Sequence, residues 1–505
     1  MATRGWLTKR VLVGVAVLLA IGMGGGVARA QSTAETIAQL KAQVDDLQRR
    51  LNALEHLQEK TTALDQKTTA LDQRVQVIDR RDQVAEQERK EWQSKQPVIQ
   101  ADSRGFYIES QDQKSYVLHV GGYGQVDGRF YTSQDSTTAA NNPSAASTFL
   151  LRRARPYFEG TVDEWLDYRL MLEFGQAAPN SSTGTVQDAY GDIHFFDAIR
   201  LRFGKFKEPV GLERLMDDRY LEFVERGYPT QLVGDRDLGF QVWGQPFNKI
   251  VEYQLGLFNG VADNVSNANG ATNEFDTNNS KDFVGRIFLR PFATAGNEYT
   301  RGLGFGIGGS YGSERGSTVA DNYKSEFQNT VFKYNTGTRA AGDRYRWSPQ
   351  ASYYAGPFGL LGEFVDNTQY LEGPFGPKKS LVGAPIANQG WQGYATWVLT
   401  GEHATDVGVV PRNPLDLRTG QWGAFELGAK LEQLLIDRDA FKLGLANPGY
   451  NAREAFTWGL GVNWYANRNL KLMVDYTLTN FAGGAPKGGD RHAESGVMSE
   501  MQFQY

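Results

Sequence analysis

Arginine recurs at alternate positions of several short segments in which apolar and polar residues alternate. Successive side chains of an extended strand point to opposite faces, so the segment 198–204 places Arg200 and Arg202 opposite its apolar residues. Other arginines lie opposite an apolar face in the same way: Arg153, Arg155, Arg169, Arg286 and Arg290. A guanidinium group is a rigid fork of N–H donors that suits phosphate or carboxylate oxygens. These residues therefore predict a face that attracts anions, with ion pairing to facing carboxylates as the alternative role.

Residue types that carry out catalysis or bind metals are sparse. The chain has no cysteine, which excludes disulfides, thiolate metal sites and cysteine nucleophiles. The histidines are scattered, and none lies in a recognisable nucleophile or metal motif: His56, His119, His194, His403 and His492. We therefore expect no enzyme, no cofactor and no metal site, with a membrane-embedded hydrolase as the alternative.

The arginine-bearing segments belong to a long run of short strands after Asp102, separated by Gly, Asn, Asp and Ser turns. The pattern predicts sixteen strands, at about 118–130, 150–162, 166–175, 188–196, 198–204, 237–244, 251–258, 283–290, 302–312, 345–355, 358–366, 391–402, 422–434, 456–466, 469–479 and 496–505. An even number of antiparallel strands in this range closes into a barrel with an aqueous channel. The predicted fold class is an all-β transmembrane barrel of about 16 antiparallel strands, preceded by an N-terminal α-helical coiled coil.

Two further patterns favour a membrane barrel over a chain of soluble β-sandwich domains. The mean hydropathy of −0.47 is compatible with a barrel, because every second residue of such a barrel faces water. Trp391 and Trp397 share one strand face, as do Trp458 and Trp464, at separations close to the height of an apolar membrane band. Sandwich domains would need internal repeats and linkers, and the sequence shows neither.

The first thirty residues have the pattern of a secretory signal peptide. Basic residues precede an apolar run, Val11–Ile21, which is too short to span a bilayer comfortably. Ala28–Ala30 gives the small-x-small cleavage pattern, so we expect a signal peptide over 1–30 and a mature chain from Gln31. The alternative is an uncleaved anchor.

Helical apolar spacing follows the predicted signal peptide. Steps of three and four residues connect a seam of apolar positions: Ile37, Leu40, Val44, Leu47, Leu51 and Leu54. We predict a coiled coil over 31–92, a linker over 93–101 and a barrel domain over 102–505. A seam this narrow cannot be buried within one chain, and it therefore implies an oligomer. The alternative is a lone solvated helix. The mixed core does not decide between two and three chains.

Acidic residues oppose the anion interpretation. The formal net charge is −5, and the predicted barrel is more acidic than basic. Acidic side chains are also expected on the inward face: Asp127, Glu252, Glu363, Glu402, Glu426, Glu432 and Asp475. A passage lined by them would be weakly selective or cation-preferring. Selectivity depends on the charge at the narrowest point, which net charge does not locate.

Four segments resemble the phosphate-selective porin O/P family. They are RFGKFKEPVGLERL (Arg202–Leu215), GDRDLGFQVWG (Gly234–Gly244), LRRARPYFEG (Leu151–Gly160) and VGGYGQVDGRFY (Val120–Tyr131). The resemblance implies an outer-membrane porin that assembles as a homotrimer and passes anions along arginine ladders and a lysine cluster. No such ladder aligns residue by residue with this chain.

The most specific of these segments leads into a long loop. A bulge at Gly204 would shift the strand's alternation and bring Lys205 and Lys207 to the lumen. Residues 212–236 then form a long loop, which in a compact architecture is usually functional. This loop carries further arginines: Arg214, Arg219, Arg226 and Arg236. The resemblance implies that the loop folds inward to constrict the pore, whereas an extracellular loop held by surface ion pairs is the alternative.

The leading hypothesis is an outer-membrane channel through which small anions diffuse, with phosphate or polyphosphate as the leading candidates. The candidate pore-lining, anion-binding residues are Arg153, Arg155, Arg169, Arg200, Arg202, Lys205, Lys207, Arg214, Arg226 and Arg236. The expected partners are small inorganic anions, outer-membrane lipid and identical chains, with the coiled coil in the periplasm and no nucleic acid. The alternatives are a weakly selective or cation-preferring porin and a structural tether that uses the coiled coil.

Overall fold

The computed structural model describes residues 28–102, 105–132, 146–175, 184–260, 279–294, 297–318, 322–376 and 380–505. The chain divides into two compact units, Met1–Ser94 and Lys95–Tyr505, and each is described by itself. Nearly all of the predicted signal peptide lies outside the described residues.

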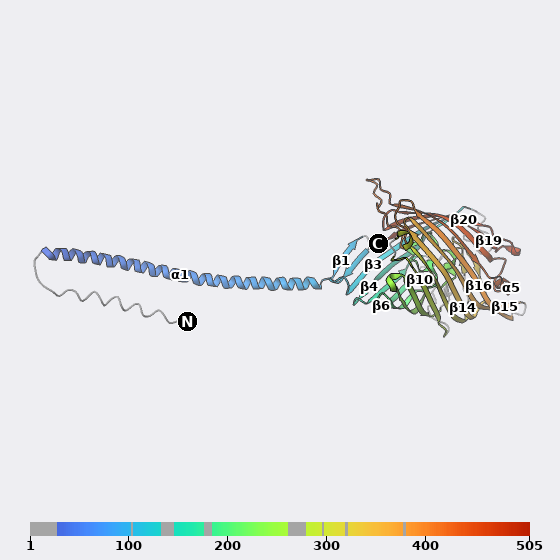
Figure 1. Ribbon diagram of the computed structural model, residues 1–505, viewed down its shortest axis with the longest axis horizontal. Coiled ribbons are helices and arrows are strands. Elements are labelled where there is room, and N and C mark those ends of the chain that lie inside the picture. The colour runs from blue at the N-terminus through green and yellow to red at the C-terminus, as the bar shows by residue number, and fades with distance from the viewer. Residues whose placement is uncertain are drawn as a thin grey trace. The chain divides into compact units, whose positions relative to one another are not determined.

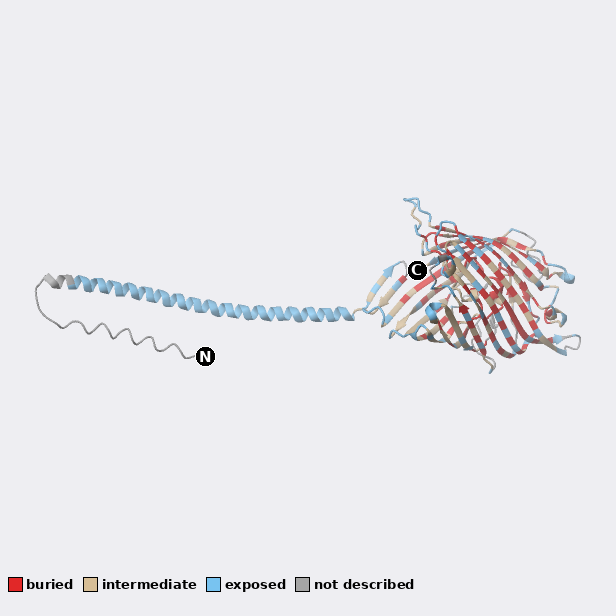
Figure 2. Cartoon of the chain, viewed as in Figure 1, coloured by how far each residue is buried: buried red, intermediate tan, exposed pale blue. Residues whose placement is uncertain are grey.

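The first unit contains one long helix, α1 (Ala28–Lys95). Its described side chains are exposed throughout, as Figure 2 shows, and the predicted seam is no exception: Leu47 and Leu64 are 63% and 66% exposed. The hydroxyls of Thr61 and Thr68 donate to the carbonyls of Leu57 (2.8 Å) and Leu64 (3.0 Å) one turn earlier. None of the described helices is both long enough and apolar enough to cross a bilayer. The pairing of α1 with other chains therefore remains a prediction.

The second unit is a closed barrel, and each of its strands runs antiparallel to its neighbours (Figure 1). Within the described residues its wall consists of sixteen strands: β3 (Tyr116–Tyr131), β4 (Thr148–Val162), β5 (Leu166–Glu173), β6 (Thr185–Phe196), β7 (Ile199–Lys207), β8 (Arg236–Gly244), β9 (Val251–Phe258), β10 (Asp282–Leu289), β11 (Leu303–Thr318), β14 (Arg339–Ala355), β15 (Phe358–Phe375), β16 (Ser380–Val398), β17 (Ala424–Leu435), β18 (Ala452–Tyr465), β19 (Leu470–Gly483) and β20 (Glu494–Gln504). The last strand closes on the first, with register partners from Gly496↔Tyr131 to Gln504↔Tyr123. The predicted sixteen-strand fold is confirmed.

Buried and exposed residues alternate along the strands (Figure 2). On β17, Leu427 and Leu431 are 39% and 49% exposed, whereas Glu426 and Glu432 are fully buried. The apolar side chains of such a strand face outward and its polar side chains face inward, as in a barrel that crosses a membrane.

Several strands are longer than predicted. β14, β15 and β16 extend beyond the predicted stretches, because their ladders continue through polar residues such as Asn367 and Asn388, which resemble turn residues in the sequence. At its other end, β16 stops at Val398, before the predicted end at residue 402. Gly401, between these two positions, adopts a φ of +85°.

The predicted linker over 93–101 differs from the structure. α1 continues to Lys95, and two extra strands follow, β1 (Val98–Asp102) and β2 (Gly105–Glu109). β2 pairs with β3 at Phe106↔Val120, next to the position where β20 ends, and so extends the barrel wall.

The two ends of the barrel differ in their connections. One end carries short turns such as 163–165, 197–198, 356–357 and 466–469. Most connections at the opposite end are longer, and they contain a hairpin and several helical turns: α2 (Leu212–Leu215), η2 (Asp218–Tyr220), η3 (Tyr228–Gln231), β12 (Asn322–Lys324), β13 (Thr330–Lys333), α5 (Arg438–Lys442) and η4 (Pro486–Gly488). Two further helical turns lie at the short-turn end: α3 (Pro246–Lys249) and α4 (Glu298–Arg301). In membrane barrels the short turns face the periplasm.

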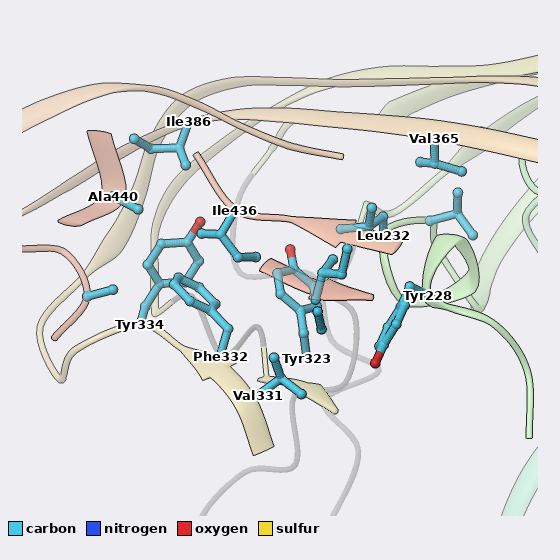
Figure 3. Packing of buried hydrophobic residues seen from close by; sticks show 14 of the residues in the cluster. Tyr228, Leu232, Tyr323, Val331, Phe332, Tyr334, Val365, Ile386, Ile436 and Ala440 are labelled. Atoms are coloured by element: carbon cyan, nitrogen blue, oxygen red, sulfur yellow. The ribbon is translucent and has the colours of Figure 1, made fainter. Parts of the chain in front are cut away.

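The largest hydrophobic core lies inside the barrel. Side chains from the β7–β8 connection, the β12–β13 hairpin and the inner wall converge there, as Figure 3 shows for Tyr228, Leu232, Phe332 and Ile436. Burying these apolar side chains stabilises the inward position of the loops. Part of the lumen is therefore filled by packed side chains.

Candidate functional site inside the barrel

The connection between β7 and β8, residues 208–235, enters the barrel and crosses the lumen; we call it the constriction loop. The backbone N–H of Leu212 donates to Oε2 of Glu363 on β15 (2.7 Å). The N–H of Val224 donates to Oδ2 of Asp475 on β19 (2.7 Å). The loop thus contacts wall strands far from those that it connects, and it lies in the lumen rather than outside the barrel.

Close packing holds the constriction loop against the wall. Six of its apolar side chains are almost fully buried: Val210, Leu221, Phe223, Val224, Leu232 and Val233. At Gly227, an added Cβ would lie 1.8 Å from Oε1 of Gln392 on β16, so this approach requires glycine. The position of the loop is therefore defined by side-chain packing as well as by backbone hydrogen bonds.

A cavity of about 210 Å³, the central cavity, lies between the constriction loop and the wall. Its cationic lining residues are Arg169, Arg202, Lys207 and Arg236, and its acidic ones are Asp188, Asp217 and Asp218. The remaining lining is aromatic, amide or apolar: Tyr123, Met171, Tyr190, Phe206, Leu215, Gln241 and Gln254. Four of the ten predicted site residues therefore meet at this cavity.

Four of the other predicted arginines hold the constriction loop in place. Arg153 lies 3.2 Å from Oδ1 of Asp218, and Arg155 and Arg226 also pair with this carboxylate. Arg214 donates to the carbonyl of Thr230 and pairs with Asp235 in the same loop. These four arginines therefore form ion pairs with carboxylates, which is the alternative to anion binding.

Arg200 lies closer to the short-turn end of β7. It pairs with Asp167 (2.6 Å) and with Asp192 (3.3 Å), and its guanidinium lies 4.7 Å from the ring centre of Trp243. It is not among the residues that line the central cavity.

The predicted bulge at Gly204 is wrong. Gly204 pairs in register with Tyr190 on one side and Gly239 on the other, and it adopts a φ of +120°. Lys207 nevertheless reaches the lumen, where its Nζ donates to the carbonyl of Met216 (2.7 Å). Lys205 is 9% exposed and is not one of the residues that line the central cavity.

Five aspartates near the constriction are each shared by two or more arginines. Asp188 contacts Arg169 and Arg236, for example, and Asp192 contacts Arg200 and Arg202. The other three are Asp217, Asp218 and Asp235. Because each carboxylate is shared by several arginines, the guanidinium groups have N–H donors that these carboxylates do not occupy.

Burial alone would raise the pKa of the loop carboxylates. For Asp218, however, the charges of Arg153, Arg226 and Arg155 outweigh burial and hold the pKa well below its usual range. Asp217 and Asp235 also have lowered pKa values, because Arg219 and Arg214, respectively, lie close to them. These carboxylates are therefore ionised at neutral pH and fix the arginines around them.

Aromatic rings orient Arg169 and Arg202 of the central cavity and Arg219 of the constriction loop. The guanidinium of Arg202 lies 4.5 Å from the ring centre of Tyr190 and 5.0 Å from that of Trp243. Arg169 and Arg219 both lie against Tyr157, at 4.8 Å and 5.2 Å. Such cation–π contacts restrict the guanidinium plane without neutralising its charge.

The predicted inward acids of the later strands do not line the central cavity. Glu363, Glu426, Glu432 and Asp475 are at most 5% exposed and lie beneath the constriction loop. Three of them accept backbone N–H groups of this loop, from Leu212, Tyr228 and Val224. Elsewhere on the wall, Glu252 pairs with Arg286 (2.5 Å) and Arg290 (3.1 Å). The acid-rich half of the lumen is therefore covered by packed loop residues.

Sequence reasoning missed Arg219 as a site residue, as well as the tyrosines that orient the arginines. Tyr157 was recognisable as an inward residue beside Arg155, and Arg219 lies within the predicted loop. Their contact joins residues 62 positions apart and has no local signature.

The chain is similar to a protein family and to several known proteins. A model of the family described as phosphate-selective porin O and P matches residues 124–505. Porin O of Pseudomonas aeruginosa is 21% identical over 420 residues, which cover 78% of this chain and 89% of that protein. The outer-membrane channel DcaP of Acinetobacter baumannii is 10% identical, with 80% of this chain and 100% of that chain covered and a TM-score of 0.47. An anion-selective porin from Comamonas acidovorans is 12% identical, with 77% and 100% covered and a TM-score of 0.46.

Proposed function

This chain belongs to the phosphate-selective porin O and P family and is an outer-membrane channel, and we propose that it selects small anions, with phosphate or polyphosphate as the leading candidates. The observation that carries the proposal is the separation of charge in the lumen. Four cations and three aspartates line the central cavity, which leaves an excess of positive charge, whereas the carboxylates of the later strands are buried beneath the constriction loop. Selectivity follows the charge that a passing ion meets at the constriction.

Lys207 supports this proposal most directly. Its Nζ donates to a backbone carbonyl, and among the described residues it forms no ion pair. It pairs in register with Arg236 of β8, so two cations are adjacent at the end of the two strands. An anion in the central cavity would offset this excess of positive charge.

Exchange of ligands along the wall provides the mechanism of passage. Guanidinium N–H groups of Arg169 and Arg202 replace part of the hydration shell of the anion, and no covalent step occurs. Their shared aspartates and stacked rings keep the groups in place, so a passing ion costs little reorganisation. The aspartates compete with the anion for the guanidinium N–H groups, which keeps anion binding weak enough for the anion to be released.

The reversal potential of single channels in a planar bilayer under a KCl gradient tests the proposal. We expect an anion-selective potential and a chloride current that low concentrations of phosphate reduce. Lys207→Gln should shift the potential toward zero and weaken the effect of phosphate. Lys442→Gln, which removes an exposed lysine of α5, is the matched control. A cation-selective potential in the wild type would refute anion selection, and a current indifferent to phosphate would remove phosphate from the proposal.

We also propose that the chain forms a homotrimer after removal of residues 1–30, with the α1 heptads in the periplasm as one contact between chains. The exposure of Leu47 and Leu51 in the single chain supports this contact, because an apolar seam left in water is unfavourable. Sedimentation of the full chain in detergent should give the mass of three copies. A Leu47→Lys, Leu51→Lys double variant should weaken association and Gln48→Lys, off the seam, should not. A monomeric wild type would contradict the proposal.

A further inference from the structure

The connection between β16 and β17, residues 399–423, is long for the short-turn end of the barrel, where 197–198 and 356–357 suffice for other strand pairs. It is folded back onto the barrel. The N–H of Ala404 donates to the carbonyl of Gly356 (2.8 Å), and the N–H of Leu415 donates to that of Ala466 (2.7 Å). Its apolar residues form a small core with the strand ends: Val398, Ala404, Val409, Ala424 and Tyr465.

This connection reaches the constriction loop. Gly408 adopts a φ of +80°, and an added Cβ would lie 3.2 Å from Cδ1 of Tyr220. Tyr220 belongs to η2, which also carries Asp218 and Arg219. The connection therefore packs against the segment that lines the central cavity.

A cavity of about 460 Å³, the exit cavity, lies between this connection, η2 and the ends of β18, β19 and β20. Four cations line it, Arg219, Arg412, Arg468 and Lys471, together with one acidic residue, Glu402. The carboxylate of Glu402 accepts the backbone N–H of Arg412 (3.1 Å) and so takes part in folding the connection.

The cations of the exit cavity differ in how far they are engaged. Arg219 pairs with Asp217 (3.0 Å), and Lys471, which is 5% exposed, donates to the carbonyl of Leu221 (2.6 Å). Among the residues that the structure describes, Arg412 and Arg468 form no ion pair. The exit cavity thus has a net positive charge with two arginines available to a ligand.

Part of the lining of the exit cavity is apolar. Val407, Val409 and Val410 line it, and Tyr220 and Tyr465 add ring surface. An inorganic anion would bind to the arginines and leave these apolar side chains exposed to water. An anion with an organic body would also bury apolar surface there, at roughly 25 cal/mol per Å².

One aromatic ring, that of Tyr157, contacts a residue of each cavity. Arg169 of the central cavity and Arg219 of the exit cavity both lie against this ring. The arginines of the two cavities are therefore neighbours across a single ring. The exit cavity lies at the short-turn end, which faces the periplasm.

We propose that the exit cavity is a second binding site, which takes organic oxyanions in which a phosphate ester or carboxylate group is attached to an apolar body. The oxyanion pairs with Arg412 and Arg468, and its body packs on the valines of the 399–423 connection. The proposal rests on the function proposed above and extends the range of solutes beyond inorganic ions.

Block of the ionic current by added anions tests this site. Phenyl phosphate, benzoate and inorganic phosphate are added in turn to the short-turn side of the channel and then to the opposite side. We expect phenyl phosphate on the short-turn side to interrupt the current at a concentration at least tenfold lower than inorganic phosphate does. Block by benzoate as well would extend the site to carboxylates, whereas block by phenyl phosphate alone would restrict it to phosphate esters; both outcomes support an organic oxyanion site.

Variants separate the exit cavity from the central one. An Arg412→Gln, Arg468→Gln double variant should raise the blocking concentration of phenyl phosphate about tenfold and leave block by inorganic phosphate from the loop side unchanged. Arg418→Gln, on the same connection but outside the cavity, is the control. Equal potency of phenyl and inorganic phosphate, block that is independent of side, or an unaffected double variant would overturn the proposal. A cation-selective wild type would refute the proposed function alone, because side-dependent block is measured independently of ion selectivity.

Discussion

Asp218 of the constriction loop lies 3.2 Å from Arg153 of β4, and the same carboxylate also pairs with Arg155 and Arg226. One buried aspartate thus fastens the loop to the wall. Because it is shared among three guanidinium groups, it anchors the loop without cancelling the positive charge around it.

Asp218→Asn should destabilise the barrel, because it removes the only charge of the loop that all three arginines share. Breaking a buried ion pair on one side typically costs about 3–5 kcal/mol. Urea titration of the folded protein in detergent measures the unfolding free energy. Asp416→Asn, which removes a carboxylate paired with the exposed Arg418, should change it by less than about 1 kcal/mol. Similar losses in the two variants would contradict the anchoring role.

Gly227→Ala should displace the constriction loop, because its Cβ would overlap Oε1 of Gln392. Overpacking of this kind costs about 1–3 kcal/mol. We expect a lower unfolding free energy and an altered single-channel conductance. Gly489→Ala is the control, since no atom lies closer than 3.7 Å to a Cβ placed there. An unchanged conductance would show that the loop does not define the passage at this point.

Glu222 should make stability depend on pH. Burial, followed by the charge of Glu426, raises the pKa of Glu222 well above 4.5, although Lys471 opposes this shift. The folded state therefore binds the proton more tightly than the unfolded state, and the stability that Glu222 contributes is present below about pH 4.5 and is lost as pH rises. Glu222→Gln should raise the unfolding free energy at pH 8 relative to the wild type and leave it nearly unchanged at pH 4. An equal change at both pH values would contradict this assignment.

Tyr157 should influence conduction through its ring rather than its hydroxyl. Tyr157→Leu removes the surface on which Arg169 and Arg219 stack, and cation–π contacts of this kind are worth about 0.5–2 kcal/mol. Tyr157→Phe keeps the ring and loses only the hydrogen bond from Arg219 (3.1 Å). We expect the leucine variant to weaken phosphate block severalfold and the phenylalanine variant to weaken it little. Equal effects would assign the role to the hydroxyl.

The strands could be predicted from the sequence because their alternation is a local pattern. The segment 251–258, for instance, corresponds residue for residue to β9. The path of the constriction loop could not be derived locally, because its contacts join distant residues such as Val224 and Asp475. Family resemblance supplied that expectation.

The candidate site could be predicted only in part, for a related reason. Strand alternation identified Arg169 and Arg202 as inward, and both line the central cavity. It also identified Arg153 and Arg155, which instead anchor the loop, because the choice depends on where Asp218 lies. The burial of Glu432 and Asp475 likewise depends on loops that approach from elsewhere in the chain.

The contacts of the constriction loop also constrain the order in which the protein is assembled. The loop follows the fifth strand of the barrel wall, yet it is held by Asp475 of β19 and by Gln502 of β20, which donates to the carbonyl of Arg219 (3.2 Å). These partners come from the last two strands of the chain. Until β20 pairs with β3, the loop lacks part of its support, so packing of the loop and closure of the barrel seam are coupled steps of biogenesis.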